Sequence, residues 1–378
     1  MPMYWNEDQQ MLADSARPFL ADKAPVSHLR ALRDEGNADG FSRDLWREFA
    51  DMGFTGLLVG EEDGGLGLGH VEAGGVLEEI GRNLSPSPFL TTSVGAVTAL
   101  KSGSPAARQA WLPGIVAGET VAALALEEGA RHRPHRVATR AERSGNGFRI
   151  DGAKSFTVQA QASDLLIVSA RTAGGEREAD GITLFAIPRS APGVTLQSEM
   201  LVDSGHAARV VLEGVEVDGD AVLGEVDRGS DTLGHVLSAL RAGSSAELVG
   251  LAEGASGMTL SYMRERKQFD RIIGSFQALQ HRAAHLYCEI EVARAATLKA
   301  QQLLDDGSEG AHEAASVAKA MTGMASALAV QEAIQMHGGI GMTDEHDIGF
   351  FMKRQRVLAE MFGDADFHAE ALARAAGY

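Results

Sequence analysis

Two short segments in the second half of the chain combine residue types that can hold an anionic or nucleotide ligand. The first, residues 264–277, places cations, an aromatic ring and amide side chains just before a long helical pattern. The second, residues 335–341, ends a helix rich in small residues with glycines, whose backbone a ligand can approach closely. Taken alone, the first segment is equally typical of a charged turn, and the second of a helix C-cap.

A basic run at residues 130–136 interrupts an otherwise acidic chain. It contains Arg131, Arg133 and Arg136 together with His132 and His135. Clustered arginines repel one another unless a negative group offsets them, so we expect either a solvated surface loop or a loop that faces an anion. Two histidines with no thiol or carboxylate nearby make a poor metal site. We therefore predict no bound metal.

The glycine-rich stretch at residues 60–69 does not match a dinucleotide-binding fingerprint. After Gly65 and Gly67 the third glycine should fall at position 70, which is His70, and no strand-helix pair brackets the stretch. No P-loop, G-x-S-x-G or H-E-x-x-H motif occurs in the sequence. We expect these glycines to form a structural loop between helices.

The hydrophobic pattern divides the chain into three regions. Residues 1–120 read as helices, because apolar residues recur at spacings of three and four. Residues 121–225 change to short runs of alternating polarity separated by turn residues, which predicts an antiparallel β unit. Residues 226–378 return to helices. We therefore expect an α+β multidomain protein with an N-terminal helical, a middle β and a C-terminal helical bundle domain over these three ranges.

Two helical patterns define the expected C-terminal bundle. One is an apolar stripe at alternating spacings of three and four, typical of a bundle helix. It consists of Phe276, Leu279, Ala283, Leu286, Ile290 and Ala293. The other, residues 316–334, is rich in small residues and can approach the first closely. Cys288 lies among the apolar positions of the first helix, and we expect it to be an inert core residue.

Composition narrows the class of protein. The 378 residues carry 34 Lys and Arg against 52 Asp and Glu, a formal charge of −18 that disfavours nucleic-acid and membrane-surface binding. A single cysteine excludes an intramolecular disulfide framework. The N-terminus does not read as a signal peptide, and no apolar stretch approaches the roughly 20 residues that span a bilayer. These features predict a soluble, cytoplasmic protein.

Taken together, the segments resemble the acyl-CoA dehydrogenase family over nearly the whole chain. Residues 45–69 are similar to its helix-loop entry, residues 126–129 to the start of its flavin-facing loop, and residues 152–156 with 162–164 to its middle-domain strand motif. Residues 266–277 and 335–341 resemble its two C-terminal signatures. The resemblance implies an N-terminal α-helical domain, a middle antiparallel β-barrel-like domain and a C-terminal four-helix bundle.

The resemblance also implies bound FAD and the oxidation of an acyl-CoA thioester to its trans-2-enoyl product. Hydrogen bonds must polarise the thioester carbonyl, a carboxylate removes the α-proton, and the β-hydrogen leaves as hydride to the flavin. The electrons then pass to an electron-transfer flavoprotein. In this family Phe156 and Val158 correspond to positions against the flavin ring, and Arg241 to a position beside the acyl-CoA.

The remaining cofactor positions are implied across a subunit interface. Arg266 corresponds to a contact with the pyrophosphate of a neighbouring subunit's FAD. The others that the resemblance assigns to FAD are Phe269, Gln277, Gln335, Gly338, Gly339 and Asp364. A split site of this kind predicts a dimer-based tetramer.

The sequence departs from the family where the catalytic base is expected. The usual glutamate corresponds to Phe362, and its alternative location, just before Arg241, corresponds to Leu240. Neither side chain can accept a proton, so the catalytic residue stays unknown. Nearby substitutes are Glu247, Glu360 and Asp364. The basic run also replaces the family's Gly-Ser-Asp continuation, and Val158 stands where a threonine hydroxyl normally serves the flavin.

Three functions remain open at this point. The chain is an acyl-CoA dehydrogenase with a displaced base, or a non-catalytic or half-site subunit of a heteromeric dehydrogenase like those of bacterial steroid side-chain catabolism. A same-fold flavin oxidase or monooxygenase is the third. The first two imply a homotetramer or an α2β2 heterotetramer in fatty acid or steroid side-chain breakdown.

Overall fold

The computed structural model describes residues 3–178 and 180–378 as two compact units. The first unit takes in the chain up to Ala31, His70–Ser85 and Arg241–Tyr378, and the second takes in Leu32–Gly69 and Pro86–Leu240. Both units therefore include parts of the expected N-terminal domain. The boundaries at residues 120 and 225 stay predictions, and each compact unit is described by itself below.

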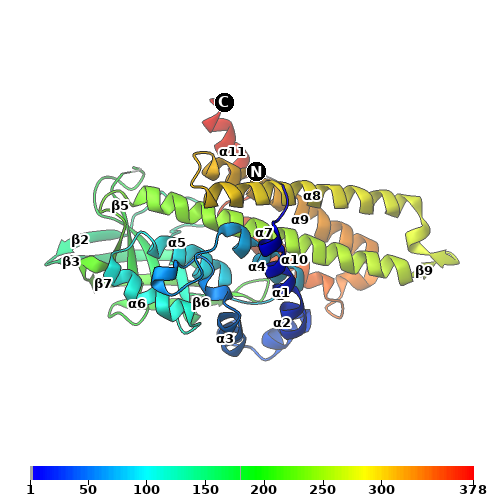
Figure 1. Cartoon of the computed structure of the whole chain (residues 1–378), viewed down its shortest axis with the longest axis horizontal. Helices are drawn as coiled ribbons and strands as arrows, with labels where there is room; N and C mark the ends of the chain where they lie inside the picture. Colours follow the sequence, from blue (N-terminus) through cyan, green and yellow to red (C-terminus); the bar gives the residue numbers. More distant parts are fainter. Residues whose placement is uncertain (1–2, 179) are drawn as a thin grey trace. The chain divides into compact units, whose positions relative to one another are not determined.

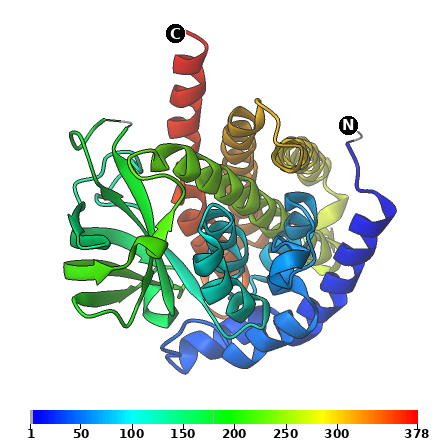
Figure 2. The ribbon, with the colours of Figure 1, turned by 60° about the vertical axis from the view of Figure 1, so that its left-hand side comes forward.

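The second unit is organised by a curved sheet, drawn in shades of green in Figure 2. Its strands are β1(Ala122–Ala125), β2(Arg140–Ser144), β3(Gly147–Val158), β4(Leu165–Arg171), β5(Ile182–Pro188), β6(Val194–Met200), β7(His206–Val217) and β8(Val222–Leu223). The ladder order is β6-β7-β3-β2-β4-β5-β8, with β1 paired to β4. Side chains from the inner faces form one core, which includes Phe148, Ile150, Val168, Phe185 and Val210.

The sheet differs from the expected antiparallel unit at two places. Strand β1 pairs with β4 in parallel, with Ala122 opposite Leu165, and β2 meets β4 in one parallel pair, Arg140 with Arg171. All other ladders of this sheet among the described residues are antiparallel. Alternating polarity reports which side chains are buried and carries no information on strand direction. Every residue of β1 and β4 is buried, as is usual for parallel pairs.

Short helices complete the second unit. They are α3(Arg43–Asp51), the 3-10 helices η1(Phe54–Gly56) and η2(Glu61–Asp63), the π-helix η3(Leu90–Ala96), α5(Val97–Leu100) and α6(Pro105–Val116). Ser42 caps α3 by accepting a hydrogen bond from the Leu45 N–H at 3.2 Å. The glycine stretch folds back on η1 as a structural loop, and a Cβ at Gly65 would lie 2.2 Å from the Val59 carbonyl oxygen. The predicted loop is therefore confirmed.

The first unit is helical. It contains α1(Glu7–Lys23), α4(His70–Asn83), α8(Gln277–Asp305), α9(Ala311–His337), α10(Ile348–Glu360) and α11(Ala365–Ala375), together with most of α7(Gly229–Glu265) and the start of α2(Val26–Asp34). Figure 1 shows α8 and α9 as long neighbouring rods. Leu286, Ile290 and Ala293 of the predicted stripe are buried, and Leu286 and Ile290 pack with Ala329 of α9. Small side chains, among them Ala300 and Ala318, let the two helices approach closely.

Two details of the first unit bear on the sequence predictions. Cys288 of α8 is exposed, so the prediction that it is a core residue is wrong. Leu286 and Ile290 of the stripe point into the core, and the helical period places position 288 on the opposite face. Among the described residues, no helix is long and apolar enough to cross a membrane.

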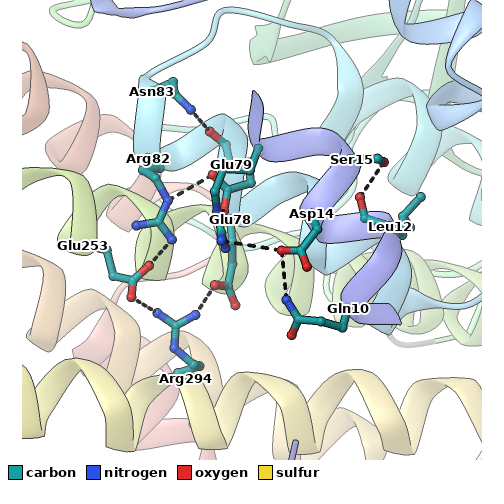
Figure 3. A network of polar contacts seen from close by, with 11 residues as sticks. Gln10, Leu12, Asp14, Ser15, Glu78, Glu79, Arg82, Asn83, Glu253 and Arg294 are labelled. Atoms are coloured by element: carbon teal, nitrogen blue, oxygen red, sulfur yellow. Dashed lines mark hydrogen bonds and ion pairs between the residues drawn. The ribbon is translucent and has the colours of Figure 1, made fainter. Parts of the chain in front are cut away.

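A partly buried network of charges links helices of the first unit (Figure 3). Arg294 of α8 pairs with Glu78 of α4 and with Glu253 of α7, and Arg82 joins Glu253 to Glu79. Glu78 and Glu79 are buried. Burial raises the pKa of Glu78 to about 7, against the opposing charge of Arg294. The network therefore contains a carboxyl group that titrates near neutral pH.

Candidate functional site

The end of β3 presents an aromatic ring on a strained backbone. Phe156 is 45% exposed and has a φ of 52°, which is uncommon for a bulky residue. The ladder between β3 and β7 shifts register between Lys154 and Thr157, so this residue lies in a bulge. Val158 follows as the half-buried last residue of the strand. A bulge that turns a large ring outward is typical of a ligand contact rather than of core packing.

Two glutamates fix the loop that passes beside this bulge. The Glu127 carbonyl accepts a hydrogen bond from the Ser155 N–H at 2.7 Å, which places the loop next to Phe156. The Glu128 carboxylate accepts hydrogen bonds from the Ala138 and Thr139 N–H groups and pairs with Lys154 Nζ at 2.7 Å. Burial alone would raise the pKa of Glu128, but Lys154 lowers it, while burial lowers the pKa of Lys154 itself. The pair anchors the loop to the sheet.

The basic run forms the tip of that loop. The Glu127 carboxylate lies 2.5 Å from His132 Nδ1 and accepts a hydrogen bond from the Arg133 N–H, so a carboxylate does approach the histidine pair. Even so, the described residues contain no cluster of metal-ligating side chains. Arg136 pairs with Glu176 at 2.6 Å. Arg131 and Arg133 are exposed, and their guanidinium groups form no ion pair within residues 3–178 and 180–378.

The first C-terminal signature forms an exposed hairpin in the other unit. Strands β9(Lys267–Gln268) and β10(Arg271–Ile272) pair around Phe269, which is 84% exposed with a φ of 53°. Arg266 precedes β9, and Gln277 begins α8; both side chains are exposed. The Arg266 backbone is fixed on both sides, because its N–H bonds to Tyr262 and its carbonyl accepts from Ile273. The side chains are therefore presented outward from an ordered backbone.

The second signature lies at the same end of the bundle. Met336 of α9 packs with Met263 of α7 and Ile273 of the first signature. Gln335 is exposed, and Gly338 ends the helix with a φ of 64°. A Cβ at Gly338 or Gly339 would meet no atom within 4 Å, so this backbone is open to an approaching group. The structure thus brings together six of the predicted cofactor residues in one patch of the first unit.

A third group of predicted residues surrounds the turn after α10. Arg241 is half-buried and its Nε donates to the Phe362 carbonyl at 3.1 Å. Lys319 of α9 is only 1% exposed, and its Nζ donates to the Ala359 carbonyl at 2.6 Å and to the Gly363 carbonyl at 3.1 Å. Burial lowers the pKa of Lys319 to about 7, and Glu360 opposes this shift. Two basic side chains from different helices therefore donate hydrogen bonds to the backbone around Phe362.

The substitute carboxylates near this turn are already engaged or exposed. Glu247 is buried and accepts two hydrogen bonds from Arg354, at 2.9 and 2.6 Å. Asp364 caps α11 by accepting from the Phe367 N–H at 2.7 Å. Glu360 is exposed at the end of α10. The Asp364 carboxylate is therefore committed to capping α11, and its predicted contact with the cofactor stays a prediction.

Sequence reasoning missed three of the side chains that organise these places: Glu127, Glu128 and Lys319. A lysine inside a helix of small residues was the available signal for Lys319, since buried lysines are rare unless they have a partner. The two glutamates carried no comparable signal, because their partners lie across a loop.

Comparisons with known proteins agree with this arrangement. Family models match residues 6–119 as "Acyl-CoA dehydrogenase, N-terminal domain", 122–215 as the middle domain and 227–377 as the C-terminal domain. The chain is 31% identical over 358 residues to acyl-CoA dehydrogenase FadE12 of Mycobacterium tuberculosis, covering 93% of this chain and 91% of the relative.

Two solved structures with paired names are also similar. The Tcur3481-Tcur3483 steroid ACAD is 30% identical with a TM-score of 0.89, covering 98% of this chain and 99% of the other. The ChsE4-ChsE5 complex of Mycobacterium tuberculosis is 25% identical with a TM-score of 0.89 and full coverage of both chains. The predicted three-domain fold is confirmed, and this chain is a member of the acyl-CoA dehydrogenase family.

Proposed function

We propose that this chain is one subunit of a heteromeric, FAD-dependent acyl-CoA dehydrogenase and depends on a partner subunit for the catalytic base. The proposal rests on the identities of Phe362 and Leu240, because the family resemblance predicts a catalytic glutamate at one of these two positions. The surrounding turn is nevertheless held by Lys319 and Arg241. An intact scaffold that carries a phenylalanine supports a subunit specialised for binding rather than for proton removal.

The residues present fit a flavin nucleotide. The outward ring of Phe156 and the side chain of Val158 suit an isoalloxazine, and the exposed guanidinium of Arg266 suits a pyrophosphate. The open backbone at Gly338 and Gly339, with Gln335 beside it, suits an adenosine. FAD bound there would accept the β-hydrogen as hydride. In our proposal the Phe156 half of a site comes from one subunit and the Arg266 half from its neighbour.

The missing carboxylate limits what the chain can do alone. A thioester α-hydrogen is weakly acidic, and a positioned general base typically contributes about 10²–10⁴-fold in rate. Phe362 can pack against an acyl chain but cannot take a proton. Arg241 beside it keeps a cationic, half-buried side chain at the place assigned to acyl-CoA binding.

The runner-up function is a dehydrogenase with a displaced base. It is less well supported, because Glu247 would first have to leave Arg354 and Asp364 would have to uncap α11. Glu360 is the freest of the three, being exposed at the helix end. A flavin oxidase or monooxygenase would need no glutamate at position 362, and no specific contact in the structure favours it.

The proposal implies particular partners and surroundings. The second subunit would be another family member that carries the glutamate, giving an α2β2 tetramer, and the acceptor would be an electron-transfer flavoprotein in the cytoplasm. Two similar structures have names that pair two proteins, one of them described as a steroid ACAD. This similarity favours steroid side-chain over fatty acid breakdown as the pathway.

The test begins with the purified chain, alone and co-expressed with a family member encoded nearby. Flavin content is measured, and then anaerobic bleaching of the flavin with a panel of acyl-CoA thioesters. We expect slow or absent bleaching for the chain alone and rapid bleaching for the pair. Phe362→Glu should restore bleaching to the chain alone if the rest of the acyl site is present.

The matched controls are Glu247→Gln, Glu360→Gln and Asp364→Asn in the unpaired chain. If one of these abolishes flavin reduction that the wild-type chain performs alone, the displaced base is identified and the partner-dependent proposal fails. Rapid bleaching by the wild-type chain that survives all three changes together would contradict both versions.

A further inference from the structure

A polar cavity of about 370 Å³ lies in the second unit, along β2 and at the end of β4. This volume is within the range of small-molecule sites, about 300–1,000 Å³. Its charged lining consists of Arg140, Arg143 and Arg171 together with Glu142 and Asp227, and Phe148 forms part of its wall. None of these residues belongs to the flavin or acyl-CoA positions described above. In a chain with a formal charge of −18, a cavity with more cations than anions requires a physical reason.

Arg171 supplies a buried positive charge to this cavity. It is 1% exposed, and its guanidinium donates only to backbone carbonyls, those of Asp180 at 2.7 Å and Glu178 at 3.0 Å being the shortest. The other acceptors are the carbonyls of Glu176, His135 and Val137. These bonds satisfy its N–H groups without a carboxylate in direct contact, so the positive charge is solvated by dipoles and not cancelled.

Arg140 brings a second cation close to the first. Arg140 is the direct partner of Arg171 in the bridge between β2 and β4. Burial lowers the pKa of Arg171, Glu178 opposes the shift, and the Arg140 charge lowers it further. Arg143 adds a third cation, whose guanidinium lies over the Phe148 ring at 5.0 Å from its centroid. Neither Arg140 nor Arg143 has an ion-pair partner within residues 3–178 and 180–378.

Asp227 gives the cavity an acceptor that lacks a donor. Its Oδ1 is buried and forms no hydrogen bond with any described residue. The backbone of Asp227 is fixed, because its N–H donates to Thr183 Oγ1 at 2.9 Å and its carbonyl accepts from the Gly181 N–H at 2.7 Å. Its φ of 69° is uncommon outside glycine. A buried, unsatisfied carboxylate oxygen held in this way is costly unless a ligand or water donates to it.

We propose that this cavity binds a phosphomonoester attached to a hydroxyl-bearing ring, the chemistry of a nucleotide's ribose phosphate. Arg140 and Arg143 carry guanidinium forks suited to phosphate oxygens, and Arg171 adds charge from behind. A ribose hydroxyl donates to Asp227 Oδ1, which a bare phosphate cannot do without repulsion. The 3′-phosphoadenosine end of coenzyme A and a free nucleotide both have this chemistry.

The test measures ligand binding to the full chain saturated with FAD, so that a flavin site cannot take up the probes. Adenosine 5′-monophosphate, adenosine 3′,5′-bisphosphate and orthophosphate are titrated by calorimetry at low ionic strength. We expect saturable binding of at least one nucleotide. Arg140→Gln with Arg143→Gln should weaken it by roughly tenfold or more, since charge-assisted hydrogen bonds are lost. Arg149→Gln, on the neighbouring strand β3 and outside the cavity lining, is the matched control and should change little.

Asp227→Asn distinguishes specific binding in this cavity from nonspecific binding to a basic surface. The change should weaken binding of the nucleotide while leaving orthophosphate binding equal or tighter, because it removes a repelling charge. If the cavity prefers the bisphosphate, and coenzyme A competes for it while 3′-dephospho-coenzyme A does not, the natural ligand is the 3′-phosphoadenosine end of coenzyme A. Equal binding of the monophosphate without such competition assigns it to a free nucleotide. No saturable binding of either nucleotide up to 10 mM, a loss equal to that of the Arg149 control, or a parallel effect of Asp227→Asn on all three probes overturns the proposal.

Discussion

Lys319 Nζ donates a hydrogen bond to the Gly363 carbonyl at 3.1 Å, so a buried amino group holds the residue that follows Phe362. A second bond from the same nitrogen, to the Ala359 carbonyl, satisfies an end of α10 that no later helical residue can reach. Phe362 and Gly363 both have positive φ, at 62° and 102°. The turn that presents residue 362 is therefore imposed from outside by a neighbouring helix.

The first prediction concerns the pH dependence that Lys319 gives to stability. Its pKa falls from 10.5 to about 7 on folding, so between these values the unfolded chain binds the extra proton and stability rises with pH. The unfolding free energy of the wild type should therefore rise relative to that of Lys319→Met, by up to several kcal/mol, as the pH increases from 7 toward 10. Denaturant unfolding at a series of pH values measures it, with Lys23→Met as the exposed control.

A second prediction has the opposite sign and concerns Glu78. Its pKa rises from 4.5 to about 7 on folding, so between these values the folded chain holds the proton and this group's contribution to stability is lost as pH rises. Glu78→Gln should therefore reduce the fall in unfolding free energy between pH 4.5 and pH 7, by about 3 kcal/mol at most. Unfolding midpoints compared with those of Glu313→Gln, an exposed glutamate on α9, provide the measurement. Identical pH profiles for both variants would remove Glu78 as the cause.

The third prediction concerns the retention of FAD. Arg266→Ala should lower the ratio of FAD to protein after gel filtration while shifting the melting temperature by less than about 2 °C, because the side chain is exposed and its backbone carries the fold contacts. Arg264→Ala, two residues earlier and also exposed, should retain FAD. A monomeric wild-type chain holding FAD at full occupancy would contradict the split site.

The fourth prediction tests the basic run. Replacing Arg131, Arg133 and Arg136 together by glutamine should weaken nucleotide or acyl-CoA binding and make the remaining affinity less sensitive to salt, since charge-assisted contacts are lost. The exposed Arg136–Glu176 pair contributes little by itself. A control that removes the same charge elsewhere in the second unit is Arg47, Arg149 and Arg209 to glutamine. Equal affinities for the two triple variants would identify the loop as a solvated surface.

The sequence predicted the elements well where a pattern had one physical cause. The stripe on α8 and the small residues of α9 follow from helix geometry and close packing, and both were confirmed. Strand direction in the sheet was not predictable, because β1 is placed beside β4 by a long connection and alternation is the same in both orientations. Contacts across loops were equally inaccessible, and the pairing of Glu127 with His132 depends on a turn that neither residue signals.

The roles of the candidate site residues stay predictions, but the structure adds a contact that the resemblance did not include. The Asp364 side chain, which the resemblance assigns to the cofactor, caps α11. An aspartate directly before a helix is a recognised capping position, so this role was readable from Asp364 followed by the helical pattern. The burial of Lys319 depended on carbonyls 40 and 44 residues away along the chain, which no local pattern can indicate.

Each compact unit is built from segments that are far apart in the sequence, and this determines when the first unit can fold during synthesis. The chain changes unit after Ala31, Gly69, Ser85 and Leu240, and α4 finds its ion-pair partner Arg294 on α8. A ribosome adding about 5–20 residues per second needs roughly 10–40 s to make the intervening stretch. During that interval the buried Glu78 is without its partner arginine on α8. Native folding of the first unit is therefore expected to finish only after translation, and shortening the chain at its C-terminus should yield aggregation before it yields a folded fragment.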